Sequence, residues 1–462
     1  MSLLGTPENP LVVAVVGSGP SGFYAAEHLF KQLGSGVRVM MIERLPTPFG
    51  LVRGGVAPDH QKIKSVTKVY DRIAQREGFS FLGNVEFGTA LPLDMLRQFA
   101  HAVIFATGAQ TDRSLGIDGE DLPGSHAATE FVAWYNGHPD YRHLTFDLSA
   151  ERAIVVGVGN VAIDVARILG RTCDELSKTD IADYALDALD HSRVKEIVVI
   201  GRRGPAQAAF SPPELKELSE MPDTDLIVAP EDAALDPLSE AWLKTSGDRD
   251  AAKNVALLHE YSQHAPQGKS RRIVMRFLTS PVAIHGSGKV EAVTLGRNML
   301  VERDHGYLSA EPTGETEVMS AGLVFRSVGY RGVALPGVPF DAKRGVIPNS
   351  DGRVLNAPGG QPVPGLYAVG WIKRGPSGII GTNKPDSVAT VDSLLADLQA
   401  GTFGDTPASG GLEAALRANG VRVVSYSDWQ RLDALETHAG ERLGRPRVKL
   451  TDIDQMLAAL DE

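Results

Sequence analysis

The feature that most constrains this fold is a glycine-rich turn between an apolar run and a helical pattern, close to the start of the chain. The stretch LVVAVVGSGPSGFYAAEHLFKQL places the apolar residues 11–16 directly before glycines in the spacing GxGxxG. In such a unit Gly17 permits a tight turn, Gly19 lets the backbone approach a pyrophosphate, and Gly22 lets the helix pack on the strand. The helix N-terminus then presents unpaired N–H groups to the anion, so the unit predicts dinucleotide binding.

An acidic residue follows this unit where a ribose contact is expected. A second apolar run, VRVMMIE, ends at Glu43, which lies 21 residues beyond Gly22. A carboxylate at that distance accepts hydrogen bonds from the hydroxyls of an adenosine ribose. The glycine spacing alone is weak evidence, but the strand, the helix and the terminal acid together make dinucleotide binding a specific prediction.

A second unit of the same kind occurs in the middle of the chain. RAIVVGVGNVAIDVARIL carries Gly157, Gly159 and Ala162 in the spacing GxGxxA, and the strand expected next, KEIVVIGRR, ends in Arg202 and Arg203. Paired arginines at a strand end are also typical of a solvated turn. Here, however, they replace the acid of the first unit, and guanidinium groups pair with a 2′-phosphate that a carboxylate would repel. We therefore expect the second nucleotide to be NADP.

Two unlike dinucleotide sites in one chain indicate a flavin that exchanges hydride with a pyridine nucleotide. We expect an α/β fold with two Rossmann-like domains, arranged as in glutathione reductase, in which an inserted NADP domain splits the FAD domain. The expected bounds are 1–108 for the first half of the FAD domain, 109–321 for the NADP domain, and 322–462 for the second half with a C-terminal extension. In this scheme HAVIFATGAQ (101–110) closes the first half and AGLVFRSVGY (321–330) resumes it.

A further strand and glycine-rich turn, GLYAVGWIKRGPSGIIGTNKPD, precede a helical pattern that runs from about residue 385 to Gln399. The positive end of this helix could lie beside the flavin and stabilise negative charge on its reduced form. A simple turn that caps a helix is the alternative interpretation.

Composition narrows the chemistry available to the chain. Its 462 residues include 46 Lys and Arg against 57 Asp and Glu, and this net charge of -11 disfavours a nucleic-acid partner. The one cysteine, Cys173, excludes an intramolecular disulfide, a CxxC redox pair and an iron–sulfur cluster held by four cysteine thiolates. Redox chemistry must therefore be carried by a bound cofactor.

Other site types find no support in the sequence. His259 and His264 are five residues apart and do not form an HExxH motif, so we expect no metal site. There is no GxSxG or GxxxxGK[ST] motif for acyl or phosphoryl transfer. The N-terminal apolar run is too short for a signal sequence or a membrane span, which predicts a cytoplasmic location.

Three stretches together resemble the adrenodoxin reductase family, and its bacterial NADPH-ferredoxin reductases look most similar. They are TPFGLVRGGVAPDHQKIK (47–64), IGRRGPAQAAFSPPEL (200–215) and GWIKRGPSGIIGTNKPD (370–386). The resemblance extends from about residue 11 to the C-terminus, although the region beyond about 404 is less distinctive and suggests no chemistry. It implies that FAD takes hydride from NADPH and passes electrons one at a time to ferredoxin or a similar small acidic iron–sulfur protein.

The resemblance also implies roles for individual residues. The implied FAD contacts, beyond the first glycine-rich turn, are Ser21, Glu43, Leu51, Val85, Trp371, Gly378, Ile379 and Ile380. The implied NADP contacts are Gly159, Asn160, Val161, Arg202, Arg203 and Glu214, with Gly378 near the nicotinamide. His60 of APDH and Glu214 of PPEL match the polar pair beside the reaction centre of the family, where they would orient the nicotinamide without forming a covalent intermediate.

Two other functions remain open from the sequence: an NADPH-dependent flavin monooxygenase, which the missing FxGxxxHxxx signature disfavours, and a non-catalytic redox sensor that binds both nucleotides. Docking of an acidic partner must overcome the net charge of -11 through local positive groups. The candidates are Lys269, Arg271, Arg272 and Arg276, with Lys373 and Arg374 beside the expected flavin loop. Scattered, solvated charge is the alternative interpretation of these residues.

Overall fold

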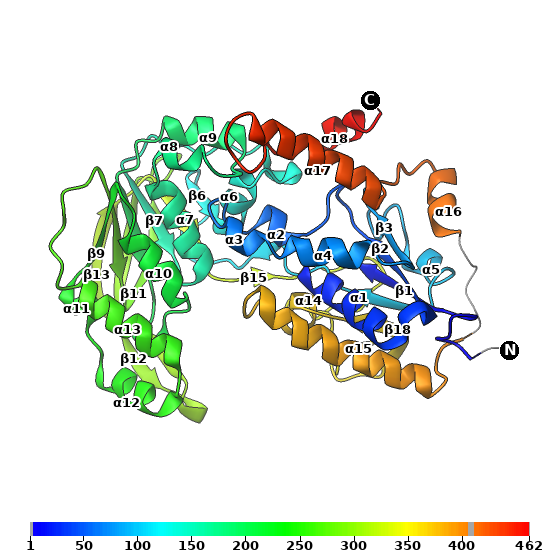
Figure 1. Ribbon diagram of the computed structural model, residues 1–462. Coiled ribbons are helices and arrows are strands. Elements are labelled where there is room, and N and C mark those ends of the chain that lie inside the picture. Colours follow the sequence, from blue (N-terminus) through cyan, green and yellow to red (C-terminus); the bar gives the residue numbers. More distant parts are fainter. Residues whose placement is uncertain (1–2, 405–410, 462) are drawn as a thin grey trace. The chain divides into compact units, whose positions relative to one another are not determined.

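The computed structural model describes residues 3–404 and 411–461. The chain forms two compact units, each built around its own sheet (Figure 1). Unit 1 comprises Met1–Val56, His60–Thr111 and Gly329–Glu462, and unit 2 comprises Ala57–Asp59 and Asp112–Val328. The two glycine-rich motifs therefore lie in different units.

Unit 1 is built on a seven-stranded sheet in the order β16-β17-β18-β4-β1-β2-β3. The strands are β1 (Leu11–Val16), β2 (Val37–Ile42), β3 (Phe79–Leu82), β4 (Ala102–Phe105), β16 (Asn349–Ser350), β17 (Arg353–Leu355) and β18 (Pro362–Ala368). β1 pairs in parallel with β2 and β4 at the centre. Its alternate residues enter different cores, with Val13 and Val15 in one and Ala14 and Val16 in the other, as a strand covered on both faces requires. The glycine-rich turn thus begins at the carboxyl end of a central strand.

Helices of unit 1 cover this sheet. α1 (Pro20–Leu33) follows the glycine-rich turn, and α15 (Asn383–Gln399), expected from about residue 385, packs against it. The hydroxyl of Ser387 in α15 donates to the carbonyl of Ser21 in α1 at 3.0 Å. The remaining helices are η1 (Gly34–Gly36), α2 (Leu51–Gly54), α3 (Gln61–Lys64), α4 (Thr67–Ala74), α5 (Leu93–Leu96), α14 (Trp371–Arg374), η5 (Ile380–Thr382), α16 (Leu412–Ala418), α17 (Tyr426–Glu441) and α18 (Ile453–Ala459).

Unit 2 is built on a six-stranded parallel sheet in the order β6-β14-β7-β8-β10-β9. The strands are β6 (Ser125–Ala127), β7 (Arg152–Val156), β8 (Glu196–Ile200), β9 (Thr224–Val228), β10 (Arg271–Arg276) and β14 (Leu323–Arg326). A separate antiparallel sheet contains β11 (Thr279–His285), β12 (Ala292–Glu302) and β13 (Leu308–Ser320). β7 and β8 are the strands expected around the second glycine-rich motif, so the α/β class with two Rossmann-like sheets is confirmed.

The helices of unit 2 follow the βαβ pattern. α7 (Asn160–Gly170) starts at the second glycine-rich turn, and α8 (Cys173–Leu176) and α9 (Asp183–Asp190) fill the interval before β8. The others are α6 (Ala128–Tyr135), η2 (Pro139–Tyr141), η3 (Pro205–Gln207), α10 (Pro212–Ser219), α11 (Pro230–Ala233), α12 (Pro237–Ser246), α13 (Arg249–Tyr261) and η4 (Asp304–Gly306). A short pair, β5 (Thr111–Asp112) and β15 (Tyr330–Arg331), completes the strands.

One expected strand belongs to the other sheet. We expected AGLVFRSVGY (321–330) to resume the first domain, but its strand β14 pairs in parallel with β6 and β7 in unit 2. A fully buried parallel strand is apolar on both faces, so its sequence does not indicate which sheet it joins. The chain returns to unit 1 only at Gly329.

Candidate functional site

The glycine-rich turn of unit 1 has the shape that a pyrophosphate needs. Gly17 has a φ of +106°, and a Cβ there would lie 2.6 Å from the carbonyl oxygen of Ala106. A Cβ on Gly22 would lie 2.4 Å from the carbonyl oxygen of Gly17, whereas a Cβ on Gly19 would meet no atom within 4 Å. The outer glycines are therefore required by close packing, and the middle one faces open space where a phosphate group fits.

Glu43 follows β2 and turns its carboxylate onto this glycine-rich turn. Its Oε2 accepts hydrogen bonds from the backbone N–H of Ser18 at 3.2 Å and from the Ser18 hydroxyl at 2.6 Å. Its Oε1 accepts from the backbone N–H of Leu45 at 3.1 Å. Because β1 and β2 are parallel neighbours, the acid at the end of one strand reaches the turn at the end of the other. Its position fits the predicted ribose contact.

Two predicted flavin contacts are large apolar side chains left in solvent. Leu51 is 38 % exposed and Ile379 is 63 % exposed, and both lie in unit 1. Single exposed apolar side chains are common on protein surfaces, so the assignment of these two residues to the flavin still rests on the resemblance. The Trp371 indole donates to the carbonyl of Ser377 at 3.1 Å, which ties α14 to the loop that contains Gly378.

Other predicted FAD residues have structural partners in unit 1. The hydroxyl of Ser21 donates to Asn383 Oδ1 at 3.1 Å, which joins α1 to the first residue of α15. Val85 is fully buried, and its backbone N–H donates to the carbonyl of Glu43 at 2.9 Å. Ile380 is the first residue of η5, directly before α15. The side chain of Val85 is covered, so any contact it makes with a ligand would come from its backbone.

The second glycine-rich turn repeats the geometry of the first in unit 2. Gly157 has a φ of +132°, and a Cβ there would lie 2.2 Å from the carbonyl oxygen of Ser327. A Cβ on Gly159 would meet nothing within 4 Å. Asn160 and Val161 open α7, and Asn160 Oδ1 accepts from the backbone N–H of Ser211 at 2.8 Å. The N-terminus of α7 therefore faces an open region that a pyrophosphate fits.

The paired arginines lie just beyond the carboxyl end of β8 in the same unit. Arg202 is exposed, and within the described residues neither it nor Arg203 has a carboxylate within ion-pair distance. The Arg203 guanidinium lies 5.7 Å from the ring centroid of Tyr307. The carbonyl of Arg202 accepts from Asn298 Nδ2 at 2.9 Å, which fixes the backbone of the pair. Two uncompensated guanidinium groups remain available for an anion. Tyr307 and Asn298 belong to the separate antiparallel sheet region, and no motif predicted them.

Glu214 is buried at the start of α10, where a fully buried arginine holds it. Arg167 Nη1 donates to Glu214 Oε2 at 2.9 Å, Nη2 donates to Asp164 Oδ1 at 2.6 Å, and Nε donates to Asp59 Oδ2 at 2.7 Å. Arg171 Nε donates to the same oxygen of Asp59 at 2.8 Å. Burial alone would lower the pKa of Arg167, but Asp164, Asp59 and Glu214 outweigh it and raise that pKa.

His60 lies in unit 1, directly before α3, and its carbonyl accepts from the backbone N–H of Ile63 at 3.0 Å. Glu214 and the preceding residue Asp59 are assigned to unit 2. The pairing of His60 with Glu214 at one reaction centre therefore stays a prediction.

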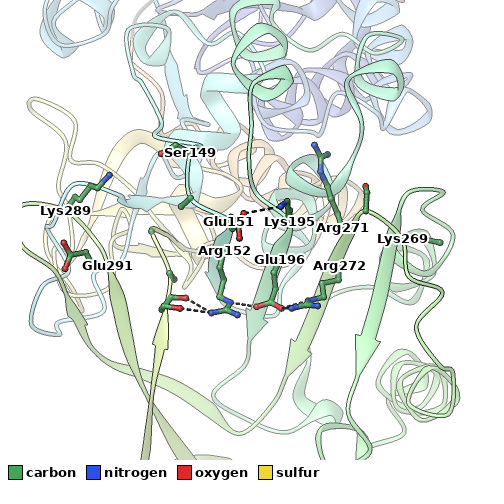
Figure 2. A pocket seen from close by; sticks show the side chains of 15 residues that line it. Ser149, Glu151, Arg152, Lys195, Glu196, Lys269, Arg271, Arg272, Lys289 and Glu291 are labelled. Atoms are coloured by element: carbon green, nitrogen blue, oxygen red, sulfur yellow. Dashed lines mark hydrogen bonds and ion pairs between the residues drawn. The ribbon is translucent and has the colours of Figure 1, made fainter.

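Most candidate docking charges have partners. Arg271 Nη1 donates to the carbonyl of Arg171 at 2.5 Å, and Arg272 pairs with Glu196, which also binds Arg152 (Figure 2). These residues line a shallow pocket of about 690 Å³ at the amino ends of β7, β8 and β10. Burial would raise the pKa of Glu196, but the two arginines hold it below its usual range. Of the docking candidates that line this pocket, Arg272 has a side chain that is 54 % exposed, and the pocket residues Lys195 and Lys289 are at least as exposed at 64 % and 60 %.

The other docking candidates are also engaged. Arg276 ends β10, pairs with Glu317 at 2.5 Å, and has a side chain only 22 % exposed. Lys373 pairs with Asp386 at 3.0 Å, and Arg374 donates to Asn383 Oδ1 at 3.0 Å. Each of these three cations therefore has an internal polar partner, and their part in docking stays a prediction. Among the described helices, none has the length and apolarity needed to cross a membrane.

Comparison with known proteins gives consistent matches. The family described as pyridine nucleotide-disulphide oxidoreductases matches residues 11–200. NADPH-ferredoxin reductase FprA of Mycobacterium tuberculosis is 47 % identical over 458 residues, which cover 97 % of this chain and 98 % of that protein. The mitochondrial NADPH:adrenodoxin oxidoreductase of Arabidopsis thaliana is 42 % identical over 464 residues, covering 97 % and 95 %. A solved structure of Mycobacterium tuberculosis FprA in complex with NADPH matches with a TM-score of 0.92 and 45 % identity, covering 98 % of this chain and all of that one (100 %).

Proposed function

This chain belongs to the adrenodoxin reductase family of NADPH-ferredoxin reductases, and we propose how its own residues serve that activity. It is an FAD-dependent NADPH:ferredoxin oxidoreductase. FAD, when bound, takes hydride from NADPH and passes electrons one at a time to a ferredoxin-type iron–sulfur protein. The residues of the chain bind and orient the two nucleotides.

Unit 1 is the FAD domain in this proposal. The open face of Gly19 receives the pyrophosphate, Glu43 accepts from the adenosine ribose, and the exposed Leu51 and Ile379 contact the flavin. The supporting observations are the close packing at Gly17 and the position of the Glu43 carboxylate on the same turn. A denatured extract of the purified protein should contain one FAD per chain. FMN in its place, or two FAD per chain, would contradict the assignment of two unlike sites.

Unit 2 is the NADPH domain, and the paired arginines select the nucleotide. Arg202 and Arg203 bind the 2′-phosphate, and the N-terminus of α7, with Gly159, Asn160 and Val161, receives the pyrophosphate. The observation that carries this assignment is the absence of any carboxylate partner for either arginine among the residues that the structure describes. An unpaired arginine pair at a strand end is ready to form charge-assisted bonds with a dianion.

Glu214 and His60 orient the nicotinamide. Glu214 is buried and held by Arg167, so its carboxylate has a fixed direction, as a positioning group requires. We assign His60 its role from the resemblance of the APDH stretch to the family. Both roles can be tested without a protein partner by kinetics with NADPH and a small acceptor such as ferricyanide. Substitution of either Glu214 or His60 should lower kcat/KM for NADPH, while the FAD content is retained.

A small acidic ferredoxin docks, in our proposal, through positive charge on unit 2. Arg271 and Arg272 begin β10 and Arg276 ends it, so these residues lie about 15 Å apart along the strand. Of the three, Arg272 is the most exposed and is the residue best able to exchange its internal partner, Glu196, for an acid of the ferredoxin. Arg271 and Arg276 contribute at longer range.

We also keep a cytoplasmic location as a prediction, which cell fractionation tests.

A further inference from the structure

Helix α17, which is distant in sequence from both glycine-rich motifs, contains a buried carboxylate. Glu436 is 1 % exposed, yet it accepts a two-pronged bond from Arg53, whose Nη1 lies 2.8 Å from Oε2 and whose Nη2 lies 2.5 Å from Oε1. Arg447 Nη1 donates to Oε2 at 3.0 Å, and the backbone N–H of Leu450 donates to Oε1 at 2.8 Å. A buried carboxylate is stable only with such partners, so the helix is fixed strongly to the Arg53 side chain.

Arg53 belongs to α2, directly after the turn formed by Phe49 and Gly50. Its guanidinium also lies 5.2 Å from the ring centroid of Trp429, the aromatic residue two turns before Glu436 in α17. The Trp429 ring makes an edge contact with Phe49 at 5.7 Å between centroids. Helix α17 therefore contacts this segment at two points: an ion pair with Arg53 and ring packing against Phe49.

The turn at Phe49 and Gly50 is strained, and it contacts the first glycine-rich turn. Phe49 has a φ of +86°, which is rare for a residue with a side chain and is retained only where surrounding contacts hold it. Its backbone N–H donates to the carbonyl of Ser18 at 3.1 Å, and a Cβ on Gly50 would lie 3.1 Å from the Cα of Gly19. The contacts thus run from α17 through Phe49 and Arg53 to the proposed pyrophosphate site.

We propose that Glu436 and Trp429 of α17 are positioning residues for FAD, which act through Arg53 and Phe49 to hold the strained turn against the glycine-rich turn. The proposal rests on the assignment of FAD to unit 1. The proposal gives a function to the C-terminal extension, in which no motif is found. Through α17, this extension supports the turn that contacts the dinucleotide site. Loss of the Glu436 carboxylate would remove the partner of the Arg53 guanidinium. The turn at Phe49 and Gly50 would then be less firmly held, and FAD would dissociate faster.

The test compares FAD release with the stability of the protein without FAD. Glu436→Gln removes the charge that Arg53 binds, and Arg53→Lys keeps the buried positive charge but cannot form the two-pronged bond. The matched control is Tyr426→Phe on the same helix, because Tyr426 bonds Asp71 and packs on Phe79 and Phe81, away from the turn. Holoenzyme is diluted and the rise of free-flavin fluorescence is followed, and thermal unfolding of each apo-protein is recorded.

We expect Glu436→Gln and Arg53→Lys to release FAD at least about 10-fold faster than the parent and to alter the visible circular dichroism of the bound flavin. Tyr426→Phe should lower the apo-protein midpoint but leave the FAD release rate within about 2-fold. Unchanged release in Arg53→Lys, or release that tracks apo-protein stability equally in all three variants, would overturn the proposal. A parent protein that binds no FAD would instead refute the assignment of FAD to unit 1, so the two failures are distinguishable.

Discussion

The guanidinium of Arg167 donates to the carboxylate of Glu214 at 2.9 Å, and both side chains are buried. The same guanidinium bonds Asp59 and Asp164 and lies 3.7 Å from a carboxylate oxygen of Glu217, so a single cation pairs with four carboxylates in unit 2. A planar group with five donors can do this, whereas an ammonium group cannot reproduce the arrangement.

Arg167→Lys should therefore release Glu214 from its fixed direction. We expect kcat/KM for NADPH with ferricyanide to fall on the order of 10-fold or more, because a small misplacement of a positioning group is costly. The control is Arg171→Lys, since the Arg171 guanidinium bonds Asp59 and Glu175 and not Glu214. Equal losses in both variants would assign the effect to Asp59, and no loss in Arg167→Lys would remove Glu214 from the proposed role.

Asp112 and His126, both in unit 2, contribute to the pH dependence of stability with opposite signs. Burial raises the pKa of Asp112 from 3.8 to about 7, so its contribution is complete below pH 3.8 and is lost as the pH rises through 7. Burial, with the nearby charge of Arg326, lowers the pKa of His126 from 6.5 to about 4. Its contribution is complete above pH 6.5 and is lost as the pH falls through 4.

Single substitutions should separate these two contributions. Asp112→Asn keeps an acceptor for the Thr129 hydroxyl and leaves only the His126 effect, so the unfolding midpoint should rise between about pH 4.5 and 6.5. His126→Asn leaves only the Asp112 effect, so the midpoint should fall over the same range. Each effect is below about 5 kcal/mol, since the larger shift, that of Asp112, runs from 3.8 to about 7 and one pKa unit corresponds to about 1.4 kcal/mol. Calorimetric scans of the parent and both variants at several pH values check the direction of each change. The same pH dependence of the unfolding midpoint in all three proteins would refute both assignments.

The role of Arg272 in docking predicts a salt-sensitive reaction with ferredoxin. Arg272→Ser should raise KM for ferredoxin several-fold at low ionic strength and flatten its salt dependence, because exposed charges lose reach as the Debye length shrinks from about 10 Å at 0.1 M to about 3 Å at 1 M salt. Ferricyanide turnover should change little. Lys253→Ser removes a somewhat more exposed cation from α13 and serves as the control. If both variants respond alike, net charge and not a docking site explains the effect.

Local chemistry explains which parts of the site the sequence could predict. The glycine-rich turns, Glu43 and the paired arginines each depend on a few neighbouring residues and a strand end, so their spacing carries the information. The buried charge clusters join residues that are distant in sequence, so no local spacing predicts them. Arg167 bonds Asp59, which is 108 positions away, and Arg53 bonds Glu436, which is 383 positions away. The sequence also does not show which sheet β14 joins, since its first three residues are apolar and such a strand can pair in either sheet.

The nucleotide preference of the double variant Arg202→Ala/Arg203→Ala tests the central claim most directly. Each arginine should contribute about 1.5 to 3 kcal/mol through its bond to the 2′-phosphate, so kcat/KM for NADPH should fall by on the order of 100-fold or more. NADH has no such phosphate, so its kcat/KM should change little and the preference between the two should nearly vanish. Arg249→Ala, an exposed arginine at the start of α13, should leave both values unchanged. A parallel fall for NADPH and NADH would contradict the account and show that the paired arginines support the fold and do not read the phosphate.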